Sequence, residues 1–344
     1  MTIQRFYFIE LLRFLAAITV VVRHYHFFFF PRSSSSTIHI LNNISAQPFY
    51  SFLELAYMKG DYAVQIFWGV SGFIFSLVYL NKNNTTPLEF FANRFARLYP
   101  LHVATLLYVS FIQIINYKIF GQSQIVSNNS IYEFFLQVFF ISGLKGESFN
   151  LPIWSVSIEI IVYIYFFLSI IYLKKFGIKY TIFIYITSLI IDKIFFSSVI
   201  NDCLRLFFTG IIVYQIDNMT KNKRLMMLYS LILFFLSFIG KFKIFVFVPG
   251  VLFLFVGLEY LVNFRNKNKF NYLGSMTYSS YLLHIPIMLT IIVIFYLLEI
   301  QETIFLKNYF FIFYLLFIFF ISYLCFNFFE RPLNIKLRKL ILKI

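Results

Sequence analysis

Two arginines and two histidines interrupt the apolar stretch LLRFLAAITVVVRHYHFFFF at residues 11–30. Ionisable side chains are costly inside a bilayer, and those found there usually face a cavity or a partner and serve a function. An α-helix turns about 100° per residue, so Arg13 and His24, eleven positions apart, differ by only about 20° in direction. They would share one stripe, about 16 Å apart along the helix axis. A histidine in that position can act as a general base near neutral pH.

The other ionisable residues of this stretch have more ordinary interpretations. His26 follows His24 by two residues, which points the two rings about 200° apart on a helix, so a metal ion shared by them is not expected. Glu10 precedes Arg13 by three residues and can form an ion pair with it. We expect the Arg23 side chain to extend toward the outer membrane interface.

The composition predicts an all-α integral membrane protein. The 344 residues are 60% hydrophobic and 12% charged, whereas soluble domains are about half apolar and a quarter charged. A membrane-spanning helix needs about 20 apolar residues. About ten segments meet this requirement, and they are 6–30, 62–80, 98–120, 153–173, 178–196, 198–216, 224–240, 242–262, 274–298 and 304–329. The hydrophobic run 131–142 is too short to span, and we expect residues 1–344 to form a single membrane domain.

The distribution of positive charge predicts the orientation of the chain. A net charge of +15 would suggest nucleic acid in a soluble protein, but here the basic residues cluster between apolar runs, as the positive-inside rule describes. Their count places both termini, including a basic tail at 331–344, in the cytoplasm. The long loops 31–61 and 121–152 then face outward, where an external substrate would arrive. Binding of nucleic acid is not expected.

Six short motifs follow one another along the chain. They are RFLAAITVVVRH at 13–24, FWGVSGFIFS at 67–76, NRFARLYP at 93–100, LPIWSVSIEIIVY at 151–163, LGSMTYSSYLLH at 273–284 and FFERPL at 328–333. In this order they resemble the acyltransferase 3 family of membrane acyltransferases. Phe14 stands where the family often has glycine, and Asn93 stands where it often has a basic residue, so a phosphate contact near residue 93 is less expected. The extra extracytoplasmic domain of the family's larger members is not expected here.

The resemblance implies transfer of an acyl group, usually acetyl, from cytoplasmic acetyl-CoA or another acyl-CoA to a hydroxyl. We expect the acceptor to be a bacterial surface polysaccharide, such as O-antigen or capsule, or its lipid-linked precursor, and the location to be the bacterial inner membrane. A small-molecule or lipid acceptor is the alternative within the enzyme class. A transporter of a glycan or small anion is the alternative outside it. Membrane lipid is a further expected partner, no metal is expected, and homo-oligomerisation stays open.

The resemblance also suggests roles for individual residues. His24 would act at the transfer point, as a general base or as an acyl carrier, and Glu159 would orient its ring. Arginine is suited to bidentate contacts with phosphate, which makes Arg13, Arg94 and Arg97 candidates for binding the acyl-CoA. The other expected donor contacts are Tyr99, Ser71, Gly72, Tyr278 and His284, and the expected acceptor contacts are Trp154 and Ser155.

Several of these residues also have a structural interpretation. Gly72 would equally suit close helix packing, and His284 would equally suit a hydrogen bond within an apolar core. Glu159 would equally suit an ion pair with an arginine. Asp202 and Arg205, three residues apart on one helix, are expected to pair with each other and to be structural.

Overall fold

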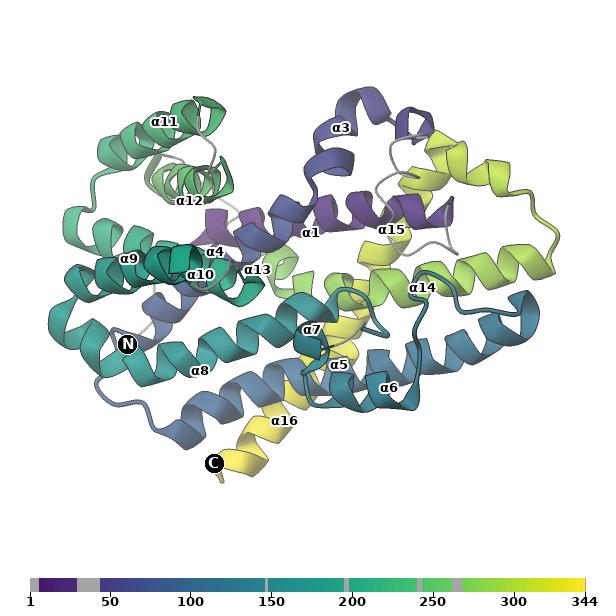
Figure 1. Cartoon of the computed structure of the whole chain (residues 1–344), viewed down its shortest axis with the longest axis horizontal. Helices are drawn as coiled ribbons and strands as arrows, with labels where there is room; N and C mark the ends of the chain where they lie inside the picture. The colour runs from purple at the N-terminus through teal and green to yellow at the C-terminus, as the bar shows by residue number, and fades with distance from the viewer. Residues whose placement is uncertain are drawn as a thin grey trace. The chain divides into compact units, whose positions relative to one another are not determined.

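The computed structural model describes residues 6–29, 44–145, 148–194, 198–239, 243–261 and 268–343. It is 86% helical, and the described residues contain no β-strand (Figure 1). The predicted all-α class is therefore confirmed.

Seven of the described helical segments are long and apolar enough to cross a membrane. Six are α4 (Asp61–Tyr79), α5 (Pro87–Phe120), α8 (Ile153–Phe176), α10 (Val199–Thr220), α12 (Lys243–Leu261) and α14 (Thr277–Leu297). The seventh is a continuous run of α15 (Asn308–Cys325), the π-helix η4 (Phe326–Glu330) and α16 (Arg331–Leu342). The chain is thus a multi-pass membrane protein.

The three remaining predicted spans are also helices, but length and composition do not establish them as spans. The segment α1 (Tyr7–His24) carries Glu10, Arg13 and Arg23 among its 18 residues. The helices α9 (Ile178–Ile194) and α11 (Lys223–Ile239) have 17 residues each. The predicted number of ten spans is therefore not confirmed.

Short helices occupy several connections. The first predicted outward loop contains η2 (Ile44–Ala46) and α3 (Tyr50–Lys59), and its residues 31–43 lie outside the described part of the chain. The second contains α6 (Ile131–Val138) and α7 (Ser142–Lys145). With eight residues, α6 is about 12 Å long and too short to span a bilayer. The remaining short elements are η1 (Tyr25–Phe28), α13 (Asn268–Ser275) and η3 (Glu302–Leu306).

The chain divides into two compact units. The first unit comprises Met1–Ala16, Asp61–Pro87 and Ile158–Ser275. The second unit comprises Ala17–Gly60, Leu88–Ser157 and Met276–Ile344.

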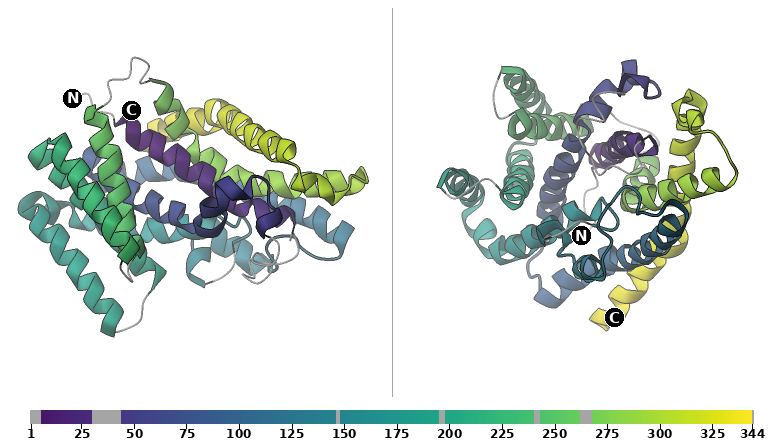
Figure 2. Two further views of the ribbon diagram at one scale, coloured as in Figure 1. Left: turned by 90° about the horizontal axis from the view of Figure 1, so that it is seen from above. Right: turned by 45° about the vertical axis from the view of Figure 1, so that its right-hand side comes forward.

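In the first unit, α4 packs on α10 and α11 packs on α12, as the views of Figures 1 and 2 also show. Glycines permit the close approach of α4 to α10. A Cβ atom at Gly72 would overlap the backbone of Phe207, and one at Gly210 would overlap the backbone of Gly69. The structure therefore gives Gly72 a packing contact that no other residue type can make.

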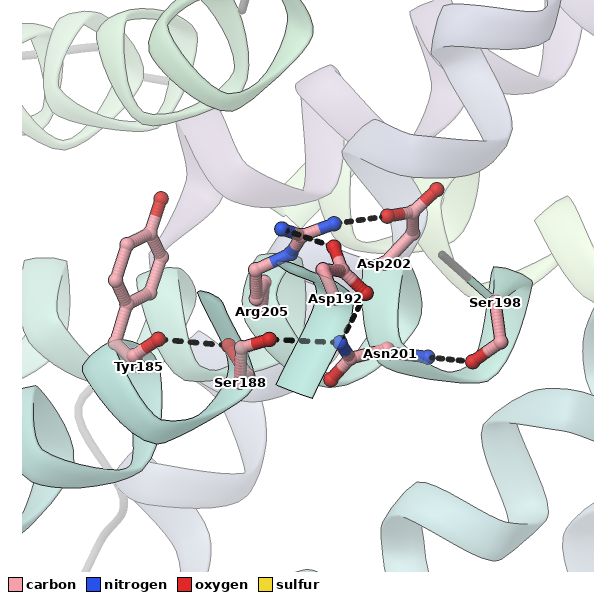
Figure 3. Close-up of polar contacts among 7 residues, drawn as sticks. All are labelled: Tyr185, Ser188, Asp192, Ser198, Asn201, Asp202 and Arg205. Carbon is pink, nitrogen blue, oxygen red and sulfur yellow. Dashed lines mark hydrogen bonds and ion pairs between the residues drawn. The ribbon is translucent and has the colours of Figure 1, made fainter. Parts of the chain in front are cut away.

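A cluster of polar side chains joins α9 to α10 in the first unit (Figure 3). Arg205, only 4% exposed, forms ion pairs with Asp202 and Asp192. Asp192 also accepts a hydrogen bond from Asn201, and the Arg205 guanidinium lies 4.1 Å from the ring centroid of Phe245 on α12. The predicted pairing of Asp202 with Arg205 is confirmed, and Asp192, near the end of α9, is paired with the same guanidinium.

The second unit has an aromatic core formed by η1, α14, η3 and α15. The Tyr25 hydroxyl donates to the Phe305 carbonyl at 2.8 Å, and the Tyr25 ring packs edge-on against Phe311. The carboxylate of Glu330, in η4, accepts a hydrogen bond from the Ser279 hydroxyl at 2.6 Å and so joins η4 to α14. This core fixes the end of α1 relative to α14.

Candidate active site

His24 is the last residue of α1, at the point where the chain continues into η1. Its neighbours Val21, Val22 and Tyr25 are buried, while the residue His24 is partly exposed. The ring of Phe27 lies 5.6 Å from the imidazole, centroid to centroid. The packing of the preceding helix and of Phe27 therefore holds His24 in place.

The residue that contacts the His24 ring most directly is His284 on α14. Nδ1 of His24 and Nε2 of His284 are 2.8 Å apart, within hydrogen-bond distance. The two rings are nearly parallel, with 12° between their planes and 5.1 Å between their centroids. The sequence suggested a donor contact for His284, but the structure places this fully buried side chain against the predicted catalytic histidine.

Several hydrogen bonds fix α14 around His284. Pro286 has no backbone N–H, so the carbonyl four residues earlier, on Leu282, loses its helical donor. The Asn150 side-chain amide donates to this carbonyl at 2.8 Å. The Tyr314 hydroxyl donates to the carbonyl of His284 at 3.1 Å. These bonds hold the backbone on both sides of the histidine.

The start of α8 also contacts α14. The hydroxyls of Ser155 and Tyr281 are 2.7 Å apart, and Ser155 also donates to the carbonyl of Pro152 at 3.1 Å. Ser155 is buried, and its hydroxyl joins the start of α8 to α14, while its predicted contact with the acceptor stays a prediction. Trp154, the neighbouring predicted contact, is partly exposed.

The predicted donor residues Arg94, Arg97 and Tyr99 lie on α5, and all three are half-buried. The Tyr99 ring stacks on Phe95 with centroids 4.6 Å apart. The hydroxyl of Tyr278, on α14, donates to the carbonyl of Leu98 at 2.9 Å. The structure thus brings Tyr278 to the segment that carries the two arginines.

The remaining predicted site residues belong to the first unit. Arg13 forms the expected ion pair with Glu10 at 2.8 Å. Ser71 and Gly72 lie on α4, and Glu159 is half-buried on α8. His24 belongs to the second unit, so an orienting contact from Glu159 stays a prediction.

Arg23 has a structural contact that the sequence did not suggest. Its guanidinium donates to the Tyr57 carbonyl, near the end of α3, at 3.0 Å. A Cβ atom at Gly60, directly after α3, would overlap the Arg23 side chain. Arg23 thus joins the segment before His24 to the loop that contains α3, and no local sequence pattern indicates this contact.

Sequence reasoning also missed Asn150, Tyr281 and Tyr314. One signal was available, since a proline inside a predicted helix requires a donor for the carbonyl four residues earlier. Pro286 therefore indicated that Leu282 needed a partner, but not that Asn150 would provide it.

Comparison with known proteins identifies a family for nearly the whole chain. The family model for an acyltransferase domain matches residues 6–327, a range that includes every predicted site residue. The comparisons with curated proteins and with solved structures give no match. Because the family model covers nearly the whole chain, and the chain has several membrane-spanning helices, this protein belongs to the acyltransferase 3 family and is a multi-pass membrane acyltransferase.

Proposed function

We propose that the protein is an O-acyltransferase of the bacterial inner membrane. It transfers an acyl group, in the simplest case acetyl, from acyl-CoA at the cytoplasmic face to a hydroxyl of a surface polysaccharide or its lipid-linked precursor. The family match supports acyl transfer. The single observation that carries the assignment of the site is the contact between a partly exposed His24 and a buried His284.

The proposed reaction converts a thioester and an alcohol into an oxygen ester and a thiol. His24 takes the proton of the acceptor hydroxyl while the hydroxyl oxygen attacks the thioester carbonyl. The carbon–sulfur bond then breaks, and the leaving thiolate takes up the proton from the imidazolium. In the alternative route, His24 attacks the thioester carbonyl, the carbon–sulfur bond breaks, and CoA leaves as the thiolate. The acceptor hydroxyl then attacks the acyl group on His24, the bond from nitrogen to the acyl carbon breaks, and the proton of the hydroxyl goes to the thiolate. Both routes use a lone pair on the His24 ring.

The acyl-CoA phosphates are assigned to the arginines of α5. Arg94 and Arg97 are three residues apart, so they project from neighbouring positions on one helix surface. Their planar guanidinium groups suit phosphate oxygens. Tyr278 supports this segment through its bond to the Leu98 carbonyl. The partly exposed Trp154 is assigned to the acceptor, because its ring can stack on the apolar face of a sugar.

The test compares wild type with His24→Ala and His102→Gln in a bacterial host whose surface glycan lacks this modification. His102 serves as the control, because it is a second histidine of the second unit, and its buried ring lies with Nε2 2.7 Å from the Gln137 carbonyl. NMR of the purified glycan measures O-acetyl groups, and immunoblotting of membranes equalises the amount of protein. Loss of a general base lowers the rate by about 10²- to 10⁴-fold.

We therefore expect O-acetylation with wild type and with His102→Gln, and almost none with His24→Ala. O-acetylation at the wild-type level with His24→Ala would overturn the role of His24. Glycan transport into proteoliposomes without consumption of acyl-CoA would instead support a transporter.

A further inference from the structure

We infer that His284 fixes the tautomer of His24 and thereby directs the lone pair of His24 Nε2 toward the substrates. In this interpretation His284 is a positioning residue and touches no substrate. The inference rests on the proposed function of His24, which it deepens by naming the reacting atom.

The first step concerns the ring of His284. Its Nδ1 lies 3.1 Å from the carbonyl oxygen of Ser280, one helical turn earlier on α14. A carbonyl oxygen can only accept a hydrogen bond, so Nδ1 of His284 carries the proton. A neutral imidazole has one N–H group, and Nε2 of His284 is then an acceptor. The neutral form is the consistent one, because His284 is 0% exposed and burial of an uncompensated charge is strongly unfavourable.

The second step transfers this polarity to His24. An acceptor at Nε2 of His284 requires a donor at Nδ1 of His24, 2.8 Å away. The proton of neutral His24 is then on Nδ1, and its lone pair is on Nε2. Among the residues that the structure describes, none forms a hydrogen bond with Nε2 of His24. This nitrogen is therefore available either to accept the acceptor's proton or to attack the thioester.

The third step concerns what holds this chain of bonds in place. The backbone of α14 is fixed at His284 by Tyr314 and at Leu282 by Asn150. His24 is the last residue of α1, and the residue before it, Arg23, donates a hydrogen bond to the Tyr57 carbonyl. Both imidazole rings are therefore attached to backbone segments that other elements hold in place. This is the arrangement expected where one group orients the base of a reaction and a rigid scaffold orients that group.

The tautomer can be tested without measuring activity. The chain contains five histidines, so we suggest solid-state NMR of protein labelled with ¹³C,¹⁵N-histidine in bilayers at neutral pH. The spectrum of wild type, compared with that of His24→Ala, identifies the His24 signals. We expect them to show a protonated Nδ1 and an unprotonated Nε2. A proton on Nε2 of His24 would overturn the inference, whatever the outcome of the glycan test.

The role of His284 is tested by His284→Gln and His284→Met. The two side chains have similar length and volume, but only glutamine places a strong acceptor oxygen near the position of Nε2. We expect His284→Gln to keep kcat within about tenfold of wild type, and His284→Met to lower it by a further factor of about 10 to 100, because the base then loses its preferred tautomer. The KM for acyl-CoA should change little in either variant.

Thermal unfolding in detergent, followed for both variants, reveals any difference in folding between them. Equal kcat values for folded His284→Gln and His284→Met would overturn the positioning role. Loss of all activity in His24→Ala together with equal values for the two His284 variants would leave the proposed function intact and remove only this inference.

Discussion

The two units hold their buried polar side chains in different ways. In the first unit, Arg205 is ion-paired with Asp192 and Asp202, and Asn201 bonds Asp192 in turn (Figure 3). In the second unit, Ser280, His284 and His24 form a single line of bonds that ends at His24, a partly exposed residue. The first arrangement is closed on itself, whereas the second ends at the ring of His24, to which we assign the reaction.

This difference separates two consequences of burying polar groups. A closed cluster of charges becomes unfavourable as soon as one member is removed, because the remaining charges stay buried without compensation. Removing a member of a line of neutral rings breaks a hydrogen bond and leaves a neutral partner unsatisfied, which costs the folded state about 1–3 kcal/mol. Substitutions in the polar cluster of the first unit should therefore mainly reduce the stability of the fold. Substitutions at His24 and His284 should mainly reduce the rate of acyl transfer.

The largest loss of stability is expected for Arg205→Leu. Removing the guanidinium leaves Asp192 and Asp202 without their shared partner and removes the contact with Phe245. Breaking a buried ion pair in this way costs about 3–5 kcal/mol. Because Asp202 is 34% exposed, we expect the loss of stability to stay below the upper end of this range. Thermal unfolding of the purified protein in detergent measures the effect.

A triple variant makes this test specific. Adding Asp192→Asn and Asp202→Asn to Arg205→Leu removes the orphaned charges, so we expect much of the lost stability to return. If the triple variant is no more stable than Arg205→Leu, the cluster contributes through packing rather than through charge.

A smaller loss of stability is expected for Gly72→Ala. The added methyl group would overlap the backbone of Phe207, so α4 and α10 must separate, at a cost of about 1–3 kcal/mol. Gly250→Ala on α12 is the matched control, because the nearest atoms there belong to the side chains of Leu233 and Phe234 at 3.3 Å or more. Unfolding temperatures of the two variants give the comparison. An altered acyl-chain preference in Gly72→Ala at unchanged stability would instead show that Gly72 contacts the donor.

The range of an interaction along the chain decided how much the sequence could predict. The Glu10–Arg13 and Asp202–Arg205 pairs were predictable, because residues three apart on a helix are neighbours. The hydrophobic runs predicted helices because this signal, too, lies within a short stretch of the sequence. The contact between His24 and His284 joins residues 260 positions apart. Each histidine had a motif of its own, but only the tertiary structure shows that they meet.

The last expected effect, similar in size to that of Gly72→Ala, concerns Asn150, which supports α14 near His284 in the second unit. Asn150→Ala removes the donor to the Leu282 carbonyl, and leaving a buried carbonyl without a donor costs about 1–3 kcal/mol. The physical reason for this bond is Pro286, which cannot supply a backbone N–H. Asn150→Ala should therefore cost less in a Pro286→Ala background, where residue 286 regains its N–H and can bond Leu282 itself. The four unfolding free energies of this double-mutant cycle measure the coupling between the two residues. Purely additive values would mean that Asn150 holds the α7–α8 connection on α14 for a reason unrelated to Pro286. The position of His284 would then not depend on a bond that compensates for the proline.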